Sequence, residues 1–345
     1  MAVLVGCGAA QRPGPGPGRS APSGATGPGS PASVWGGVYA GNSGPPGVQT
    51  FERYLGQKVT HVTLFLDTRE WQYIEYPQRY GLARYRDVPY QLVISVPLLP
   101  TDSRDTLQEG ADGLLNQHFV RLAESLVSTG MPDVILRLGW ELSGTWFTWS
   151  ARSDPEAYAT YWRQVVTAMR SVPGAHFQFD WNGGGVGAPG WNPASAYPGD
   201  RYVDYITMDL YETSGAWQHD HPTAAQARDW WKDSALSGPY ALAWTARFAA
   251  EHGKRFAIPE WGLMRRPDGH GGGDDPAFIE DVYRFCLTHH PAYADYFAYD
   301  MGNGDSSDIN DGSFPRSSQL FPVLFGAPAS ANHHGSGPSQ TGKGN

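Results

Sequence analysis

The sequence predicts one (β/α)8 TIM barrel that forms a single catalytic domain, and three observations support this. Short apolar runs rich in β-formers alternate with longer segments of helical period between residues 34 and 325. Eight such runs occur, and they are continuously apolar, as is typical of parallel strands covered by helices. Asp-Pro pairs, which start helices, stand at Asp154-Pro155 and Asp275-Pro276.

Each predicted element follows from its own local pattern. The predicted strands, in chain order, are 34–41, 59–66, 90–98, 133–138, 176–181, 202–210, 255–259 and 296–299. A first helix is predicted from Gly47 to Gln57. A later helix contains Leu115, Leu122 and Leu126 at helical spacing, and Pro132 stops it before the fourth strand. Helices follow both Asp-Pro pairs, and the second places Cys286 on its buried face as a small core residue, with a reactive thiol as the alternative.

Composition and charge limit the domain organisation and the partners. The 345 residues include 43 Gly and 28 Pro, which are concentrated near the two ends. We therefore predict a disordered leader and tether over 1–33, the barrel over 34–325 and a disordered tail over 326–345. The net charge of −9, with only 25 Lys and Arg, argues against nucleic acid as a partner. No apolar run approaches the roughly 20 residues that cross a bilayer, and we expect a monomer.

The leader contains one recognisable pattern. Leu4-Val5-Gly6-Cys7 resembles the bacterial lipobox, in which the cysteine becomes lipidated after signal cleavage. The resemblance implies export, an extracellular or cell-surface location and membrane attachment through a lipidated Cys7 alone. A Gly/Pro/Ser tether after the cysteine suits a surface-anchored enzyme. The alternative is a chance cysteine in a disordered leader.

Two glutamates end predicted strands, where the catalytic groups of such barrels lie. Glu141 follows the fourth strand and Glu260 follows the seventh. A glutamate at the end of an apolar strand is costly to bury unless it has a function or a cation partner. The two strands face each other across the barrel mouth, and two carboxyl groups about 5 Å apart are what retaining glycoside hydrolysis requires. A salt-bridged glutamate at the rim is the alternative for each residue.

Three motifs in order resemble glycoside hydrolase family 26, a member of the clan of barrels with catalytic glutamates on strands four and seven. The run 136–147 (LRLGWELSGTWF) resembles the acid/base motif of that family, and 258–262 (IPEWG) resembles its nucleophile motif. Asp209-Leu210-Tyr211 resembles its Asp-x-Tyr element, and 271–279 (GGGDDPAFI) resembles the segment after the nucleophile. The resemblance spans roughly residues 34–325.

The resemblance implies a function for these residues. Glu141 would be the acid/base, Glu260 the nucleophile, and Tyr211 a hydrogen-bond donor that orients Glu260. The implied enzyme is a retaining, endo-acting β-glycoside hydrolase that cleaves a plant or microbial polysaccharide by double displacement. β-Mannan is the first substrate expected. Mannan-cleaving members commonly have His before the acid/base, and Trp140 stands there instead, so β-1,3/1,4-glucan and β-xylan stay open.

The high aromatic content, 13% of the residues, suggests a sugar-binding cleft. Aromatic planes stack on the apolar faces of sugar rings, and polar rim residues bind hydroxyls. Arg137 shares the strand parity of Glu141, which favours an inward position where it either serves the site or makes a structural ion pair. Packing in the core is the alternative for the tryptophans. The predicted substrate contacts are Arg137, Trp140, Trp146, Trp149, Asp180, Trp181, Asn182, Asp209, Trp217, Trp261 and Asp300.

We expect neither a cofactor nor a metal. The glycines at 183–185 and 271–273 lack the Lys-Ser/Thr of a nucleotide loop and the dinucleotide spacing. His219-Asp220-His221 has no third ligand at a recognised zinc spacing, so a mobile substrate loop is the preferred interpretation. Two other functions stay open: a catalytically silent glycan-binding surface lipoprotein, and a barrel enzyme for transglycosylation.

Overall fold

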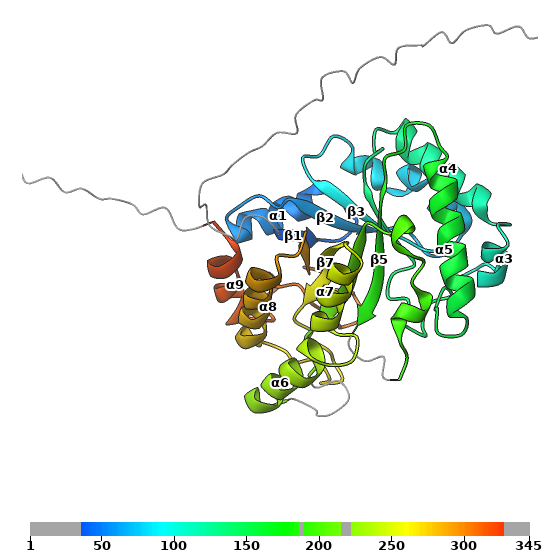
Figure 1. The fold of residues 1–345 in the computed structure, drawn as a ribbon. Coiled ribbons are helices and arrows are strands. Elements are labelled where there is room, and N and C mark those ends of the chain that lie inside the picture. The colour runs from blue at the N-terminus through cyan, green and yellow to red at the C-terminus, as the bar shows by residue number, and fades with distance from the viewer. Residues whose placement is uncertain (1–35, 186–189, 215–221, 328–345) are drawn as a thin grey trace, which may run out of the picture.

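The computed structural model describes residues 36–185, 190–214 and 222–327, and within them eight parallel strands close into a barrel (Figure 1). Each strand pairs with its neighbours in chain order, and β8 pairs with β1. The predicted (β/α)8 fold is therefore confirmed. The strands are β1 Gly36–Tyr39, β2 His61–Phe65, β3 Gln91–Val96, β4 Ile135–Leu138, β5 Gln178–Gly185, β6 Tyr205–Tyr211, β7 Arg255–Gly262 and β8 Ala294–Phe297.

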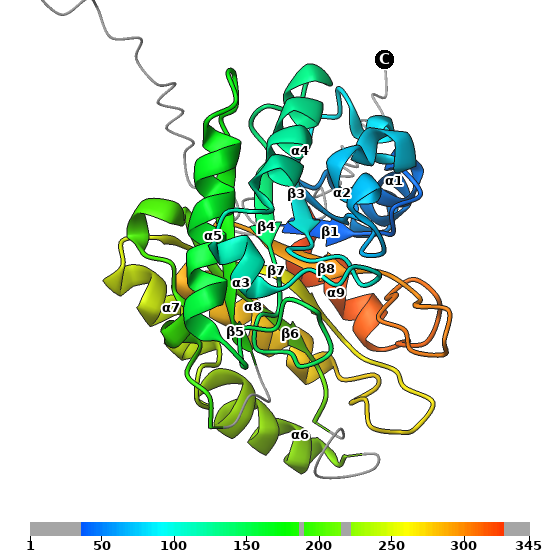
Figure 2. The same ribbon diagram turned by 90° about the vertical axis from the view of Figure 1, so that its right-hand side faces the viewer.

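Helices surround the barrel, and Figure 2 shows α4 and α5 side by side along one flank. Both Asp-Pro start signals act as expected: Asp154 accepts a hydrogen bond from the Ala157 N–H at 2.9 Å, and Asp275 accepts one from Ala277 at 3.0 Å. The helices are α1 Pro45–Leu55, α2 Trp71–Glu75, α3 Leu107–Ala111, α4 Asn116–Ser128, α5 Pro155–Arg170, α6 Ala224–Trp230, α7 Leu242–Glu251, α8 Pro276–His289 and α9 Ser317–Phe325. Short 3-10 turns cover Pro77–Tyr80, Leu82–Tyr85, Pro193–Ala196 and Asp200–Tyr202, and a π-turn covers Trp231–Leu236.

The barrel interior differs from the layer between strands and helices. The outer layer is apolar, and Cys286 is buried in it on α8, as predicted. The interior carries buried polar side chains on several strands, namely Thr63, Ser95, Arg137, Asp180, Asn182, Thr207, Asp209, Glu260 and Asp295. Apart from Ser95, each of these side chains makes a hydrogen bond or ion pair with another of the set, and these contacts fix their geometry.

The eighth predicted strand, 296–299, was placed two residues too late, because β8 begins at Ala294 and ends at Phe297. Three sequence features lie outside the described residues: Cys7, Trp217 and the His219-Asp220-His221 cluster. Within the described ranges, the longest apolar helices fall short of what a bilayer crossing requires.

Candidate active site

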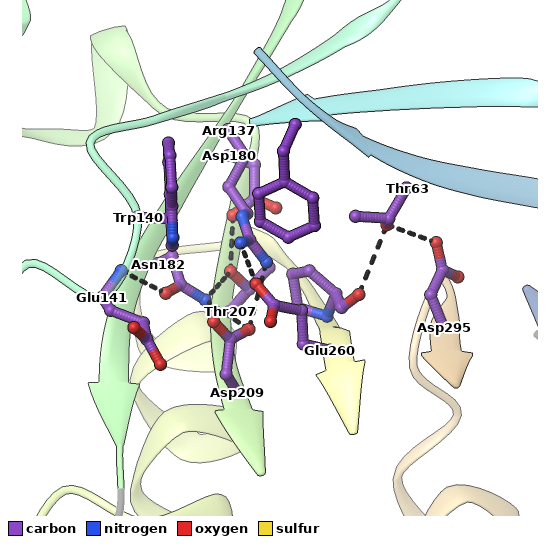
Figure 3. A network of polar contacts seen from close by, with 12 residues as sticks. Thr63, Arg137, Trp140, Glu141, Asp180, Asn182, Thr207, Asp209, Glu260 and Asp295 are labelled. Carbon is purple, nitrogen blue, oxygen red and sulfur yellow. Dashed lines mark hydrogen bonds and ion pairs between the residues drawn. The ribbon is translucent and has the colours of Figure 1, made fainter. Parts of the chain in front are cut away.

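The carboxyl ends of β4, β6 and β7 bring together the residues that the motifs singled out (Figure 3). Glu141 follows β4, Tyr211 ends β6, and Glu260 lies in β7 beside Asp209, its partner in the β6 register. Beside them lies a cleft of about 220 Å³. The lining residues are Glu141, Ser143, Trp146, Gly184, Gly185, Asp209, Tyr211, Thr213, Arg266 and His270.

Glu260 is held by a donor at each carboxylate oxygen. The Arg137 guanidinium makes a close ion pair with Oε1, and the Tyr211 hydroxyl donates to Oε2 at 2.7 Å. The hydrogen bond from Tyr211 that the resemblance implied is therefore present. Arg137 is fully buried, and Glu260 is 5% exposed. Charge-assisted bonds in such a dry setting stabilise the negative charge of Glu260.

Glu141 is held differently. Its backbone has a φ of +48°, which is uncommon for a residue with a Cβ, and its N–H donates to the Asn182 side-chain oxygen at 2.7 Å. Its Oε2 receives one long bond from the Trp146 indole at 3.3 Å. Burial raises the pKa of Glu141 to about 7, the charge of Glu260 adds to this, and Arg137 and the Trp146 bond oppose it. Of the two glutamates, Glu141 is therefore the one that is still protonated in part near neutral pH.

Asp209 and Asn182 connect the two glutamates. The Asn182 amide donates to Asp209 Oδ1 and to Thr207 Oγ1, both at 3.1 Å, and Asp209 Oδ1 also receives Arg137 at 3.2 Å. Burial raises the pKa of Asp209 well above its ordinary value. Asn182 is 1% exposed, so its predicted role as a substrate contact is replaced by that of a bracket which fixes the Glu141 backbone.

Three predicted sugar contacts are wrong, because their rings lie in the core. Trp149 is fully buried, and its indole donates to the Trp140 carbonyl at 3.0 Å. Trp181 is fully buried beside Tyr197, and Trp261 is 1% exposed and stacks on Phe321. Core packing, the alternative weighed for the tryptophans, explains all three.

Four further predicted contacts also have other roles. Arg137 is occupied by its carboxylate partners and does not line the cleft. Asp180 lies deep in the barrel, where it accepts from Thr207 at 2.5 Å and from Tyr293 at 2.6 Å. Trp140 is 5% exposed and packs between the aromatic rings of its neighbours. Asp300 is exposed in a turn, where it accepts the Gly302 N–H, and it is not a lining residue.

The cleft wall includes residues that the sequence did not single out. Arg266 and His270 follow β7, and Ser143 and Thr213 follow β4 and β6. Arg266 pairs with Asp268 at 2.7 Å. Their only signal in the sequence is a place shortly after a strand carrying a predicted catalytic group. Among the predicted aromatic contacts, Trp146 lines the cleft and is 70% exposed.

Part of the sequence that forms this site matches a known protein family. Positions 103–243 match the model of glycosyl hydrolase family 26, a range that includes Glu141 and Tyr211. Over these residues the chain is similar to members of this family. The match ends before Glu260, whose place rests on the β6–β7 register and on the Arg137 and Tyr211 contacts.

Two relatives with a described activity are similar to part of this chain. A mannan endo-1,4-beta-mannosidase of Bifidobacterium adolescentis is 26% identical over 181 residues, which are 50% of this chain and 17% of that protein. Endoglucanase H of Acetivibrio thermocellus is 29% identical over 115 residues, 31% of this chain and 13% of that protein. The matches thus span less than a fifth of either relative's length.

The fold has counterparts among solved structures. A β-mannanase from a symbiotic protist of the termite Reticulitermes speratus, complexed with gluco-manno-oligosaccharide, aligns with a TM-score of 0.56 at 16% identity. The alignment covers 85% of this chain and 87% of that one. At this identity the likeness establishes the shared barrel fold.

Proposed function

We propose that this chain is a retaining, endo-acting β-glycoside hydrolase in which Glu260 is the nucleophile and Glu141 the acid/base. The observation that carries the proposal is the unequal setting of the two carboxyl groups. Arg137 and Tyr211 hold Glu260 as a carboxylate, whereas burial raises the pKa of Glu141 to about 7 so that it retains a proton. Two carboxyl groups kept in opposite protonation states meet the requirement of this reaction.

The proposed reaction has two steps. Glu260 attacks the anomeric carbon, the glycosidic bond breaks, and its electron pair leaves on the oxygen, which takes the proton of Glu141. Water then attacks the same carbon, Glu141 removes its proton, and the bond to Glu260 breaks. Because Glu141 is a carboxylate after the first step, it serves as base in the second. Tyr211 orients Glu260 throughout.

The substrate we propose is a neutral β-linked polysaccharide, with β-mannan first. Support comes from the match of residues 103–243 to the family 26 model, from the mannosidase relative and from exposed Trp146, whose ring offers a stacking plane in the cleft. Because one relative is an endoglucanase, β-1,3/1,4-glucan is a second candidate substrate, and β-xylan is a third. Since such polymers do not enter cells, we propose that the enzyme acts outside the cell, and lipid labelling of wild type against Cys7→Ser tests its attachment.

The test is hydrolysis of purified mannan, mixed-linkage glucan and xylan, with product analysis by size and by NMR of the first anomer released. We expect internal cleavage with retained configuration, complete loss of turnover in Glu260→Ala and wild-type turnover in the control Glu124→Ala, an exposed residue on α4. Wild-type activity in Glu260→Ala contradicts the assignment. Tight binding of one glycan without cleavage identifies a silent binding protein instead.

A further inference from the structure

Glu260 stands at a break in the sheet. On the β8 side the register shifts between Ile258 and Trp261, so that Pro259 and Glu260 together face Asp295 alone. On the β6 side the register shifts as well. Such bulges re-aim a side chain, and they are frequent beside active sites. Because Pro259 has no N–H, this point of β7 also has one backbone donor fewer with which to fix its position.

A side-chain pair from two other strands reaches this break. Thr63 Oγ1 on β2 lies 2.7 Å from Asp295 Oδ2 on β8 and 3.3 Å from the carbonyl oxygen of Pro259 (Figure 3). Thr63 and Asp295 are fully buried, and Pro259 is buried too. The contact therefore joins the bulge in β7 to β2 and β8 inside the barrel, where all three residues are buried.

The number of protons decides how this contact is made. A threonine hydroxyl has one proton, whereas a carbonyl oxygen and a carboxylate both accept. Thr63 satisfies both neighbours only if Asp295 carries a proton and donates it to Thr63, which then donates to Pro259. The other Asp295 oxygen has no hydrogen-bond partner and faces Gly37, where an added Cβ would come within 1.9 Å. An ionised carboxylate without further donors is poorly placed there.

The charges around Asp295 point the same way. Burial raises its pKa to about 8, and the charge of Asp180 adds to this, while the Thr63 bond and Arg137 act against it. The Tyr293 hydroxyl lies near Asp295, but it donates its proton to Asp180 and so does not stabilise a charge on Asp295. The carboxyl is therefore neutral at pH 7.

We infer that Thr63 and Asp295, the latter as a neutral carboxylic acid, are positioning residues for Glu260. Asp295 donates to Thr63, Thr63 donates to the Pro259 carbonyl, and this chain of bonds holds the bulge that aims the Glu260 carboxylate. The catalytic part of the inference rests on the proposed role of Glu260 as nucleophile.

Matched variants separate this role from simple stability. Thr63→Val removes the hydroxyl that donates to the Pro259 carbonyl, and Asp295→Ala removes the carboxyl that directs this hydroxyl. Each is expected to lower kcat about 10- to 100-fold with KM unchanged, because a small misplacement of a reacting group lowers the rate by this much. Thr63→Ser keeps the hydroxyl, and Asp295→Asn keeps a donor toward Thr63. Both should retain kcat close to that of wild type. Wild-type kcat in Thr63→Val overturns the positioning role.

A second measurement does not depend on activity. The folded chain keeps the Asp295 proton that the unfolded chain releases near pH 4, so this residue lowers the unfolding free energy as pH rises from about 4 to about 8. Asp295→Asn lacks this contribution, and its stability relative to wild type should therefore increase over that pH range. A difference that stays flat or reverses shows an ionised Asp295 and overturns the inference. If wild type cleaves no glycan, the proposed function fails, while this measurement still decides the protonation state.

Discussion

Arg137→Met tests the electrostatic centre of the site. The substitution keeps a long apolar side chain and removes the guanidinium that pairs with Glu260 and Asp209. Arg137 is fully buried, and the side chains of its two partners are 7% and 4% exposed. Water therefore cannot replace the lost cation.

The magnitude follows from that burial. Removing one partner of a buried ion pair leaves an uncompensated charge and typically costs about 3–5 kcal/mol of unfolding free energy. Arg121→Met is the matched control, because Arg121 pairs with Glu75 at 2.9 Å but is 40% exposed. Such partly exposed pairs contribute about 0–1 kcal/mol. Arg137→Lys, which keeps the charge but not the planar fork, should fall between wild type and Arg137→Met.

Chemical denaturation at pH 7 and pH 5 measures the effect. We expect the large loss in Arg137→Met at pH 7 and a smaller one at pH 5, where the stranded carboxylate is neutralised more readily. A loss in Arg137→Met no larger than that in Arg121→Met would falsify the view that a buried cation balances this site. Equal losses at the two pH values would contradict its electrostatic cause.

The remaining predictions concern the acid/base, the cleft wall and the barrel interior. The kcat/KM of hydrolysis should fall as pH rises through about 7, because Glu141 must be protonated to act as acid. Trp146→Phe should shift this fall to higher pH, since the indole hydrogen bond lowers the pKa of Glu141. Steady-state pH profiles in which the fall does not shift contradict the assignment. Trp146→Ala should raise KM about fivefold through loss of about 1 kcal/mol of ring contact. Leu114 is 69% exposed away from the cleft, so Leu114→Ala should leave KM unchanged. Gly37→Ala should lower the unfolding free energy by about 1–3 kcal/mol, measured by thermal or urea unfolding, because its Cβ would lie within 1.9 Å of Asp295. At the neighbouring Gly36 an added Cβ has open space, so Gly36→Ala should leave the unfolding free energy nearly unchanged. Equal losses in the two variants exclude the overpacking explanation.

Features that depend on the ends of the strands could be predicted from the sequence. Parallel strands in a closed barrel place their carboxyl ends on one face, so two glutamates 119 positions apart could be assigned to one site from the strand pattern alone. The Tyr211 contact followed from the family motif. Local pattern and motif order therefore sufficed to predict the fold and to place Glu141, Glu260 and Tyr211 at the same end of the barrel.

Loop tryptophans could not be sorted in this way. Trp146 and Trp149 stand three residues apart in the same loop, yet one is 70% exposed and the other fully buried. The difference depends on the path of the loop, which lets the Trp149 indole reach the Trp140 carbonyl. The role proposed for Thr63 was equally hidden, because it depends on a bulge in β7 and on Asp295 in β8, two features without a local sequence signal.

Charge balance explains why the interior needs protonated acids. Within residues 36–185, 190–214 and 222–327, Arg137 is the one buried arginine or lysine, and it meets a larger set of buried carboxyl groups. One cation can balance one carboxylate, and Arg137 pairs with two acids, Glu260 and Asp209. Burial raises the pKa of Asp180 to about 6, of Glu141 to about 7 and of Asp295 to about 8. At pH 7 Asp180 is therefore mostly ionised, whereas Asp295 and Asp209, whose pKa burial also raises, stay mostly neutral, and Glu141 is protonated in part, as a general acid requires.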